Sequence, residues 1–233
     1  GSNWKPIGDT SAQRFSGTFD GNGHSISGLT MNTANASQGM FAMGAGGCVI
    51  KNLRLLNVNI TGGNLTGGIM GNTAAGATPE LNVKIQNCAV SGSITGGVST
   101  GGIIGNSNGV TITGCYSEGT VTGTGTAVGG IAGLIGTNGK ILNCYSTADV
   151  ESTKERAGGI IGTHNATNSE ITGCWTSGNV SSGTNFSGGI IGIFSNATGI
   201  TTRSCIALSE EISSPGIAAR ISSSMSGTYE RLF

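Results

Sequence analysis

Small or apolar side chains alternate with polar ones in short blocks along this chain. In one such block, one parity holds only small or apolar residues, namely Cys144, Ser146, Ala148 and Val150. The other parity holds Tyr145, Thr147 and Asp149. A period of two is typical of β-strands with one face inside, so the pattern predicts short strands around a narrow interior. Two further blocks share this parity, one from Cys115 to Val121, which places Gly119 inside, and one from Cys174 to Val180.

These blocks recur at a steady interval. The clearest copies are "ITGCYSEGTV" from Ile112, "ILNCYSTADV" from Ile141 and "ITGCWTSGNV" from Ile171. A second block, with the pattern Gly-Gly-Ile-x-Gly, begins at Gly67, Gly101, Gly129, Gly158 and Gly188. A unit of roughly 30 residues cannot bury its apolar side alone, so repeats of this length stack into solenoids or propellers.

We predict an all-β fold, a right-handed parallel β-helix (solenoid) of about 29-residue repeats with terminal caps. Propeller blades usually carry hairpin turns, and no regular Asn-Gly hairpin separates these blocks. Parallel crossovers are right-handed by strong preference. The predicted single domain spans 1–233, with a lead-in or cap over 1–47, coils over 48–205, and a C-terminal coil or cap over 206–233.

One block departs from strict alternation. In "LRLLNVNI", which begins at Leu53, the apolar residues share one face only if Leu55 is followed by Leu56, Val58 and Ile60. Such spacing is typical of a β-bulge, in which one strand carries one extra residue. We therefore predict a one-residue bulge in this coil.

The six cysteines follow the repeat. Five of them share one inward column with a leucine, in the order Leu53, Cys88, Cys115, Cys144, Cys174 and Cys205. Three disulfides are one possibility for an exported protein. However, stacked Cβ atoms stay nearly 5 Å apart, whereas a disulfide needs about 3.8 Å. We therefore predict buried free thiols that pack as small hydrophobic groups.

Composition excludes several classes of protein. Charged residues make up 9% of the chain, with 11 basic and 11 acidic side chains, so we expect no nucleic-acid partner and no binding to an anionic membrane. The 36% of hydrophobic residues argue against disorder. No apolar run reaches about 18 residues, so we expect no membrane insertion by this segment.

The repeated "GGIIG" and "GGIAG" blocks, with the cysteine–aromatic blocks, resemble the GLUG-motif repeats of bacterial cell-surface proteins, which include IgA-specific metallopeptidases. The stretch "FSGTFDGNGHSISGL", residues 15–29, is similar to the lead-in of such repeats. The resemblance implies an exported, adhesin-like β-helix at the cell surface or outside the cell. For the IgA-specific metallopeptidases, it implies a non-catalytic region of a larger protein. No "HExxH" stretch occurs, so peptidase activity does not carry over. Gly1 and Ser2 look like an added start, so we expect that any export signal was removed.

Candidate catalytic groups are few. "GVSTG" around Ser99 matches a nucleophile-elbow pattern, but the elbow needs a strand-to-helix turn that this loop does not supply. His24 and His164 are predicted to be solvated loop residues, and the charged run 149–156 to be a solvated turn. Asp20 is predicted to shape a tight turn rather than to bind calcium. We predict no catalytic residue, no metal site and no cofactor.

The strongest candidate site is the outward column beside the cysteines. It reads Arg54, Ala89, Tyr116, Tyr145, Trp175 and Ile206, so three consecutive coils present aromatic rings. Flat rings flanked by carboxylate and amide groups can stack on sugar rings. The candidate ligand-binding residues are therefore Tyr116, Tyr145, Trp175, Glu118, Asp149 and Asn179. The favoured alternative is an aromatic ladder that only stabilises the coils.

Taken together, these patterns favour a non-enzymatic cell-surface adhesion or binding module. Its rigid face would meet a surface glycan or a protein of a host or neighbouring cell. One alternative is a carbohydrate-active β-helix enzyme, a polysaccharide lyase or glycoside hydrolase, which would need clustered carboxylates. Another is a structural stalk of a larger exported protein.

Overall fold

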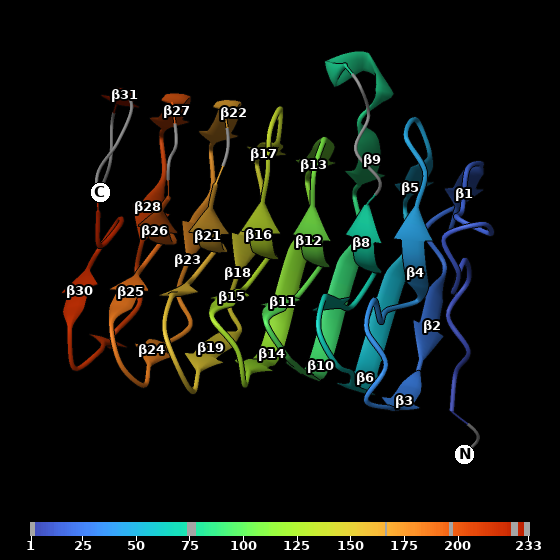
Figure 1. The fold of residues 1–233 in the computed structure, drawn as a ribbon, viewed down its shortest axis with the longest axis horizontal. Coiled ribbons are helices and arrows are strands. Elements are labelled where there is room, and N and C mark those ends of the chain that lie inside the picture. The colour runs from blue at the N-terminus through green and yellow to red at the C-terminus, as the bar shows by residue number, and fades with distance from the viewer. Residues whose placement is uncertain (1–2, 74–77, 166, 196–197, 225–227, 231–233) are drawn as a thin grey trace.

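The computed structural model describes residues 3–73, 78–165, 167–195, 198–224 and 228–230. The chain winds about one axis into a right-handed parallel β-helix of about seven turns, which confirms the predicted fold (Figure 1). Each strand pairs in parallel with its counterpart one coil away. For example, Ile112 pairs with Ile141, and Ile141 pairs with Ile171.

Each coil passes in turn through four sheets, which we number in that order. Sheet 1 contains β1 (Thr18–Asp20), β5 (Val49–Lys51), β9 (Val83–Gln86), β13 (Val110–Thr113), β17 (Lys140–Leu142), β22 (Thr167–Thr172), β27 (Thr198–Arg203) and β31 (Thr228–Glu230). Sheet 2 contains β2 (Ser25–Ser27), β3 (Thr30–Asn32), β6 (Arg54–Thr61), β10 (Ala89–Gly96), β14 (Tyr116–Gly123), β18 (Tyr145–Ser146), β19 (Asp149–Ser152), β23 (Trp175–Thr176), β24 (Val180–Ser182), β28 (Ile206–Ala207) and β29 (Ile212–Ser213).

The other two sheets have six strands each. Sheet 3 contains β7 (Thr66–Gly67), β11 (Ser99–Gly101), β15 (Ala127–Gly129), β20 (Ala157–Gly158), β25 (Phe186–Gly188) and β30 (Ile217–Ala219). Sheet 4 contains β4 (Phe41–Gly44), β8 (Met70–Thr73), β12 (Ile104–Ser107), β16 (Ala132–Ile135), β21 (Ile161–His164) and β26 (Ile191–Phe194). A short 3-10 helix, η1 (Pro79–Leu81), lies in the loop between β8 and β9.

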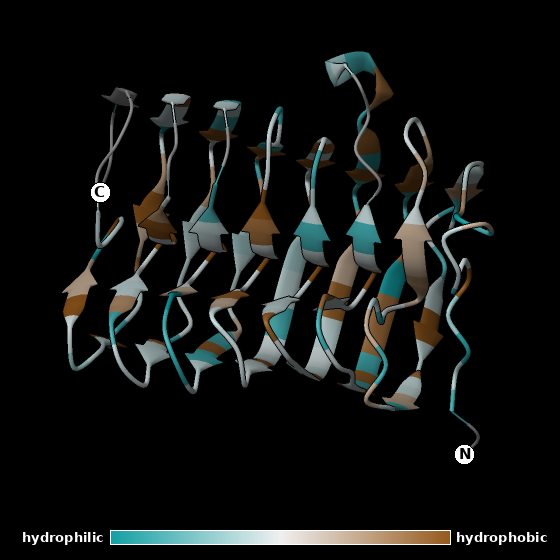
Figure 2. Ribbon diagram, viewed as in Figure 1, coloured by the Kyte–Doolittle hydropathy of each residue, from teal (hydrophilic) through white to brown (hydrophobic). Residues whose placement is uncertain are grey.

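The interior consists of columns of like residues, one from each coil. The isoleucines of the Gly-Gly-Ile blocks form one such column, which is fully buried: Ile69, Ile103, Ile131, Ile160 and Ile190. Apolar segments recur on the strands from one end of the helix to the other (Figure 2). Since burial of apolar surface is the main favourable term in folding, this continuous core explains how such short strands are held together.

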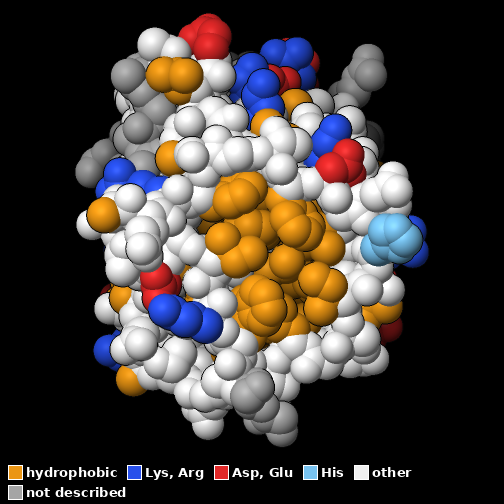
Figure 3. All heavy atoms as spheres, turned by 90° about the vertical axis from the view of Figure 1, so that its right-hand side faces the viewer, with side chains coloured by type: hydrophobic (Ala, Val, Ile, Leu, Met, Phe, Trp, Pro, Cys, Tyr) orange, Lys and Arg blue, Asp and Glu red, His pale blue; other side chains and the backbone are white. Residues whose placement is uncertain are grey.

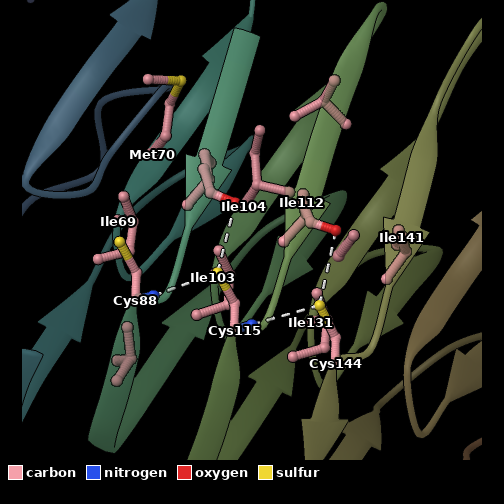
Figure 4. Packing of buried hydrophobic residues seen from close by; sticks show 14 of the residues in the cluster. Ile69, Met70, Cys88, Ile103, Ile104, Ile112, Cys115, Ile131, Ile141 and Cys144 are labelled. Carbon is pink, nitrogen blue, oxygen red and sulfur yellow. Dashed lines mark hydrogen bonds between the residues drawn. The ribbon is translucent and has the colours of Figure 1, made fainter. Parts of the chain in front are cut away.

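Five of the six cysteines, from Cys88 to Cys205, lie where sheet 1 turns into sheet 2, and Cys48 directly precedes β5 of sheet 1. The residue before each of them has a left-handed backbone, with φ of 53° at Asn143 and 66° at Gly173, and Asn and Gly tolerate that conformation best. The Sγ atom of Cys144 is 3.3 Å from the carbonyl oxygen of Leu142 and 3.7 Å from that of Ile112, so the thiol can donate to either. All six cysteines are buried and free, as predicted, and Figure 4 shows three of them aligned.

The paired glycines allow sheets 2 and 3 to approach each other closely. The hydroxyl of Ser117 donates to the carbonyl of Gly130 at 2.6 Å. A Cβ atom at Gly130 would lie 2.3 Å from the Oγ atom of Ser146 and 2.2 Å from the carbonyl oxygen of Gly159. Close packing therefore requires the second glycine of the Gly-Gly-Ile-x-Gly block, which explains why the two glycines recur in each coil.

The predicted bulge is present, but its inward set differs from the prediction. Leu55 pairs with Val90, and Val58 pairs with the residue two positions further along β10, so β6 carries one extra residue. Leu56 was expected inside, but it is only half-buried, and Asn57 is exposed with φ of 53°. Along β6, the inward-facing positions therefore pass from Leu55 directly to Val58.

The prediction for Gly119 is wrong for a related reason. This residue is exposed, not inside, and has φ of 100°. It pairs with Gly92, whose φ is 131°, so the irregularity continues into later coils. Glycine permits this backbone, and the strand returns to its inward parity at Val121.

The N-terminal end of the helix shows its apolar interior to solvent. Figure 3 views this end and shows a continuous hydrophobic area framed by polar atoms. The residues of the terminal rung that face inward are Ile7, Phe15, Phe19 and Ile26. Within the described parts of the chain, no helix has the length and apolar character needed to cross a membrane.

Candidate functional site

The three predicted aromatic residues form one continuous stack. Tyr116, Tyr145 and Trp175 begin β14, β18 and β23, and the strand register places them directly in line. The ring centroids of Tyr116 and Tyr145 are 4.8 Å apart with 4° between the planes. Those of Tyr145 and Trp175 are 4.5 Å apart with 5° between the planes. Each follows a buried cysteine, so the predicted inward and outward parity is correct here.

This stacking covers both ring faces of Tyr145 and one ring face each of Tyr116 and Trp175. Tyr145 has a ring on each side of it, so neither of its faces is free to contact a sugar ring. All three residues are half-buried. The arrangement is the one expected of an aromatic ladder, and a ligand-binding role for the stack stays a prediction.

The outward column continues beyond both ends of the stack. Ala89, which is buried, pairs with Tyr116 on one side, and Arg54 follows in the next coil. Ile206 pairs with Trp175 on the other side. Burial is the main cause that raises the pKa of Tyr145, and the nearby Tyr116 and Glu118 raise it further, whereas Arg54 lowers it. The phenol of Tyr145 is therefore neutral across the physiological range.

Asp149 and Asn179 have a structural role that the sequence did not reveal. The backbone N–H of Asn179 donates to the Asp149 carboxylate at 2.9 Å, and the backbone N–H of Glu211 donates to the Asn179 side chain at 3.1 Å. These bonds join successive coils where sheet 2 is interrupted between its short strands. Glu118, the third polar candidate, is exposed on β14. Asp149 and Asn179 therefore contribute to coil stacking, whatever else they bind.

The prediction for His164 is wrong. It is fully buried at the end of β21, in an inward column between Ile135 and Phe194. Its ring centroid is 5.5 Å from that of Phe194, and neither ring nitrogen has a hydrogen-bond partner among the described residues. Burial lowers the pKa of His164 to about 4, so the side chain is neutral at pH 7. His24, by contrast, is exposed as predicted.

Among the remaining polar candidates, Asp20 lies in a tight turn, as predicted. The carboxylate of Asp20 accepts from the backbone N–H of Asn22 at 2.9 Å and pairs with Lys51 at 3.2 Å, and these contacts lower its pKa. The run 149–156 was predicted to be a solvated turn, but its first half forms β19, with Val150 and Ser152 buried, and only its second half is a loop. Ser99 was predicted to lie in a loop, but it is buried at the start of β11. In the described residues, no group of three or more His, Cys, Asp or Glu side chains is placed to hold a metal ion.

Three hollows in the surface lie at the two ends of the helix. Two of them, of about 430 and 350 Å³, flank Trp4 at the N-terminal end. The third, of about 250 Å³, lies at the C-terminal end and includes Glu210, Ile212 and Arg220. The sequence did not indicate these hollows, because they depend on how the helix ends rather than on the repeat.

The repeat matches a known motif. Residues 124–151 match the GLUG motif family, and they include Gly129, Ile141, Cys144 and Tyr145. The chain carries the GLUG motif. The match confirms the resemblance to GLUG-repeat proteins and assigns to the motif one turn of the helix, from the end of β14 to β19.

Two further proteins are similar to this GLUG-repeat chain. Halomucin of Haloquadratum walsbyi is 36% identical over 95 residues, which cover 40% of this chain. That stretch is about 1% of the length of halomucin. The crystal structure of a candidate immunoglobulin A1 protease from Bacteroides ovatus has a TM-score of 0.68, with 22% identity. The alignment covers 99% of this chain and 73% of the other, and at this identity it shows the shared fold alone.

Proposed function

We propose that this GLUG β-helix is a non-enzymatic binding module of an exported cell-surface protein. The observation that carries the proposal is the stack of Tyr116, Tyr145 and Trp175 on one lateral face. Its partner would be a surface glycan or a protein of a host or neighbouring cell. The GLUG resemblance supports both the location and the absence of peptidase activity.

The stack is suited to binding because it is held in place before a partner arrives. Tyr and Trp are enriched among the residues that contribute most to binding at interfaces, because each side chain has an apolar ring and a polar O–H or N–H group. Side chains that are already ordered lose little conformational entropy on binding. Because both faces of the central ring, Tyr145, are covered, the contact would use the ring edges, the two tyrosine hydroxyls and the Glu118 carboxylate beside them.

A structural stalk is the second candidate. The observation that favours it is the uninterrupted register, in which sheet 1 alone runs through eight strands from β1 to β31. Such a rod would space another domain from the surface and bind nothing by itself. The observations favour a carbohydrate-active enzyme less, because its catalysis would need a pair of free carboxylates. The Asp149 carboxylate instead accepts from a backbone N–H of the next coil, and Glu155 pairs with Arg156 at 3.4 Å.

The experiment that tests the proposal is a binding screen with the purified chain on a glycan array and on intact cells. The double variant Tyr116→Phe and Tyr145→Phe removes both hydroxyls and keeps the stack, and Trp175→Ala removes one ring. We expect both to weaken binding at least about tenfold, a loss of about 1.4 kcal/mol. Lys84→Ala, on the exposed face of sheet 1, is the matched control. Binding that is equal in all variants would contradict the proposal, and no binding by the parent chain would favour the stalk.

A further inference from the structure

The segment before β1 does not follow the path of the other coils (Figure 1). Trp4 bonds to Thr30 at the edge of sheet 2, and Ile7 pairs with Phe41 of sheet 4. Only two residues lie between Trp4 and Ile7, whereas the coil beside them needs the whole stretch 31–40 for the same passage. The segment therefore goes from sheet 2 to sheet 4 without a strand of sheet 3. This path leaves a hollow between the segment and the stretch 31–40.

The hollow has the size and lining of a small-molecule site. Its volume is about 430 Å³, and such sites usually measure about 300–1,000 Å³. Trp4 and the buried Met31 supply apolar surface, and Asn3, Asn32 and Asn35 supply amide groups. The second hollow at this end, of about 350 Å³, also reaches Trp4. Trp4 therefore borders open space in two hollows.

Trp4 is exposed, yet its position is fixed. Among the described large apolar side chains that are more than a third exposed, it is the aromatic one, at 38%. Its backbone N–H donates to the carbonyl of Thr30 at 2.8 Å, and its indole Nε1–H donates to the carbonyl of Met40 at 3.1 Å. The indole N–H is thus already bonded, so the ring offers a ligand mainly its apolar surface. A ring that is already ordered loses little conformational entropy on binding.

The amide groups in the hollow are available to a ligand. The side chains of Asn32 and Asn35 are exposed, and neither forms a hydrogen bond with another described residue. Each amide offers two N–H donors and one carbonyl acceptor. A hydroxyl group both donates and accepts, so neighbouring hydroxyls on one ligand suit this pair of side chains.

The charges in the hollow offset each other. The charged residues that line it are Lys5 and Asp9, and they pair with each other at 3.2 Å. The lining therefore has no unpaired cation for a phosphate or sulfate and no unpaired carboxylate for a metal ion or an amine. A neutral ligand with an apolar face and several hydroxyls fits this combination best.

We propose that the hollow beside Trp4 binds a neutral sugar unit. The indole lies against the apolar C–H face of the sugar ring, and Asn32 and Asn35 bond to its hydroxyls. This site is separate from the aromatic stack, because β6 and β10 lie between β3 and β14 in sheet 2. Since Trp4, Asn32 and Asn35 are exposed, the hollow opens to solvent and can accept the end of a longer glycan.

Tryptophan fluorescence tests this proposal, because Trp4 and Trp175 are the two tryptophans of the chain. Trp175→Phe leaves Trp4 as the single reporter and keeps an aromatic ring in the stack. This variant is titrated with glucose, galactose, mannose, N-acetylglucosamine and the anionic glucuronate. We expect at least one neutral sugar to change the Trp4 emission in a saturable way, and glucuronate to bind more weakly. No saturable response, or a preference for glucuronate, would overturn the proposal.

A second substitution locates the sugar. In the Trp175→Phe background, Asn35→Leu should weaken sugar binding at least about tenfold. Asn108→Leu, at an exposed loop amide of a later coil, is the matched control and should bind like its parent. Both side chains are exposed, so the fold should survive, and thermal unfolding checks this. Equal affinities of the two leucine variants would contradict a site at Asn35.

The reverse reporter distinguishes this site from the stack. Trp4→Phe leaves Trp175 as the single tryptophan, and we expect its emission to stay unchanged with the same sugars. A saturable response of Trp175 without one of Trp4 would place the sugar at the stack. That result would overturn the site proposed here and leave the binding role of the stack standing.

Discussion

The indole of Trp175 lies parallel to the phenol ring of Tyr145, with the ring centroids 4.5 Å apart. This separation is close to the roughly 4.8 Å spacing of neighbouring strands, so the stack follows directly from the coil register. The interaction therefore reports on coil stacking itself, and its removal should have a measurable cost in stability.

Tyr145→Ala is expected to lower the free energy of unfolding by about 1–3 kcal/mol. Tyr145 takes part in two stacked pairs, and each aromatic pair contributes about 0.5–1.5 kcal/mol beyond its buried area. Urea denaturation followed by circular dichroism measures the loss. Tyr145→Phe keeps both pairs and should be nearly neutral, as should Thr147→Ala on the same exposed face. Equal losses in the alanine and phenylalanine variants of Tyr145 would contradict this account.

The buried His164 should make stability fall at acid pH. Burial lowers its pKa from 6.5 to about 4, so between these values the unfolded chain binds a proton that the folded chain does not. The free energy of unfolding therefore decreases as the pH falls through this window, by about 3 kcal/mol in total. Denaturation at a series of pH values measures the slope.

Carboxylates also make stability depend on pH in the acid range, and one variant separates the contribution of His164 from theirs. His164→Phe places in β21 the residue that β26 has at the paired position. It should lose the extra acid sensitivity, while His24→Gln, at an exposed site, should keep it. If the pH dependence of His164→Phe matched that of the parent, the histidine would not be its cause.

The cysteine thiols should be protected in the folded protein. All six are buried, so the reagent cannot reach them in the folded chain, and at Cys48 burial also raises the pKa to about 11, which makes its reactive thiolate scarce. We expect that iodoacetamide at mildly alkaline pH labels the chain only as fast as it unfolds, which mass spectrometry can follow. Rapid modification of the native chain would show that the cysteine column opens locally.

Gly130→Ala is expected to destabilise the helix by about 1–3 kcal/mol or more, because overpacking a close contact forces the backbone to move. The new Cβ atom would clash with the carbonyl oxygen of Gly159 and the hydroxyl of Ser146. Gly17→Ala is a suitable control, since its Cβ atom would meet only the ring of Phe15 at 3.8 Å. Thermal unfolding compares the two, and equal stabilities would show that sheets 2 and 3 can separate without cost.

The sequence was sufficient to predict the repeat, the inward cysteines and the outward aromatic column, because strand alternation and repeat spacing are local properties. It also indicated the bulge, but not that Leu56 would turn outward. That detail depends on the left-handed backbone of Asn57, which apolar patterning does not encode. The stacking of Tyr145 on its neighbours could have been inferred from the coil spacing alone.

Other features could not be read from the pattern. His164 follows a Gly-Gly-Ile block and looks like the start of a loop, but β21 continues through it and takes it into the core. The bonds made by Asp149 and Asn179 depend on the gap between β18 and β19, where side chains replace a strand ladder. The hollows beside Trp4 depend on how the segment before β1 covers the N-terminal coil, and periodicity contains no information about that.

The alignment of Ile112, Ile141 and Ile171 has a consequence for how such proteins change over evolution. Since every coil meets only the one before and the one after it, a duplication or deletion of one whole unit leaves the cross-section unaltered. Recombination can therefore change the length of the helix in steps of roughly 4.8 Å, and the contacts between coils stay the same.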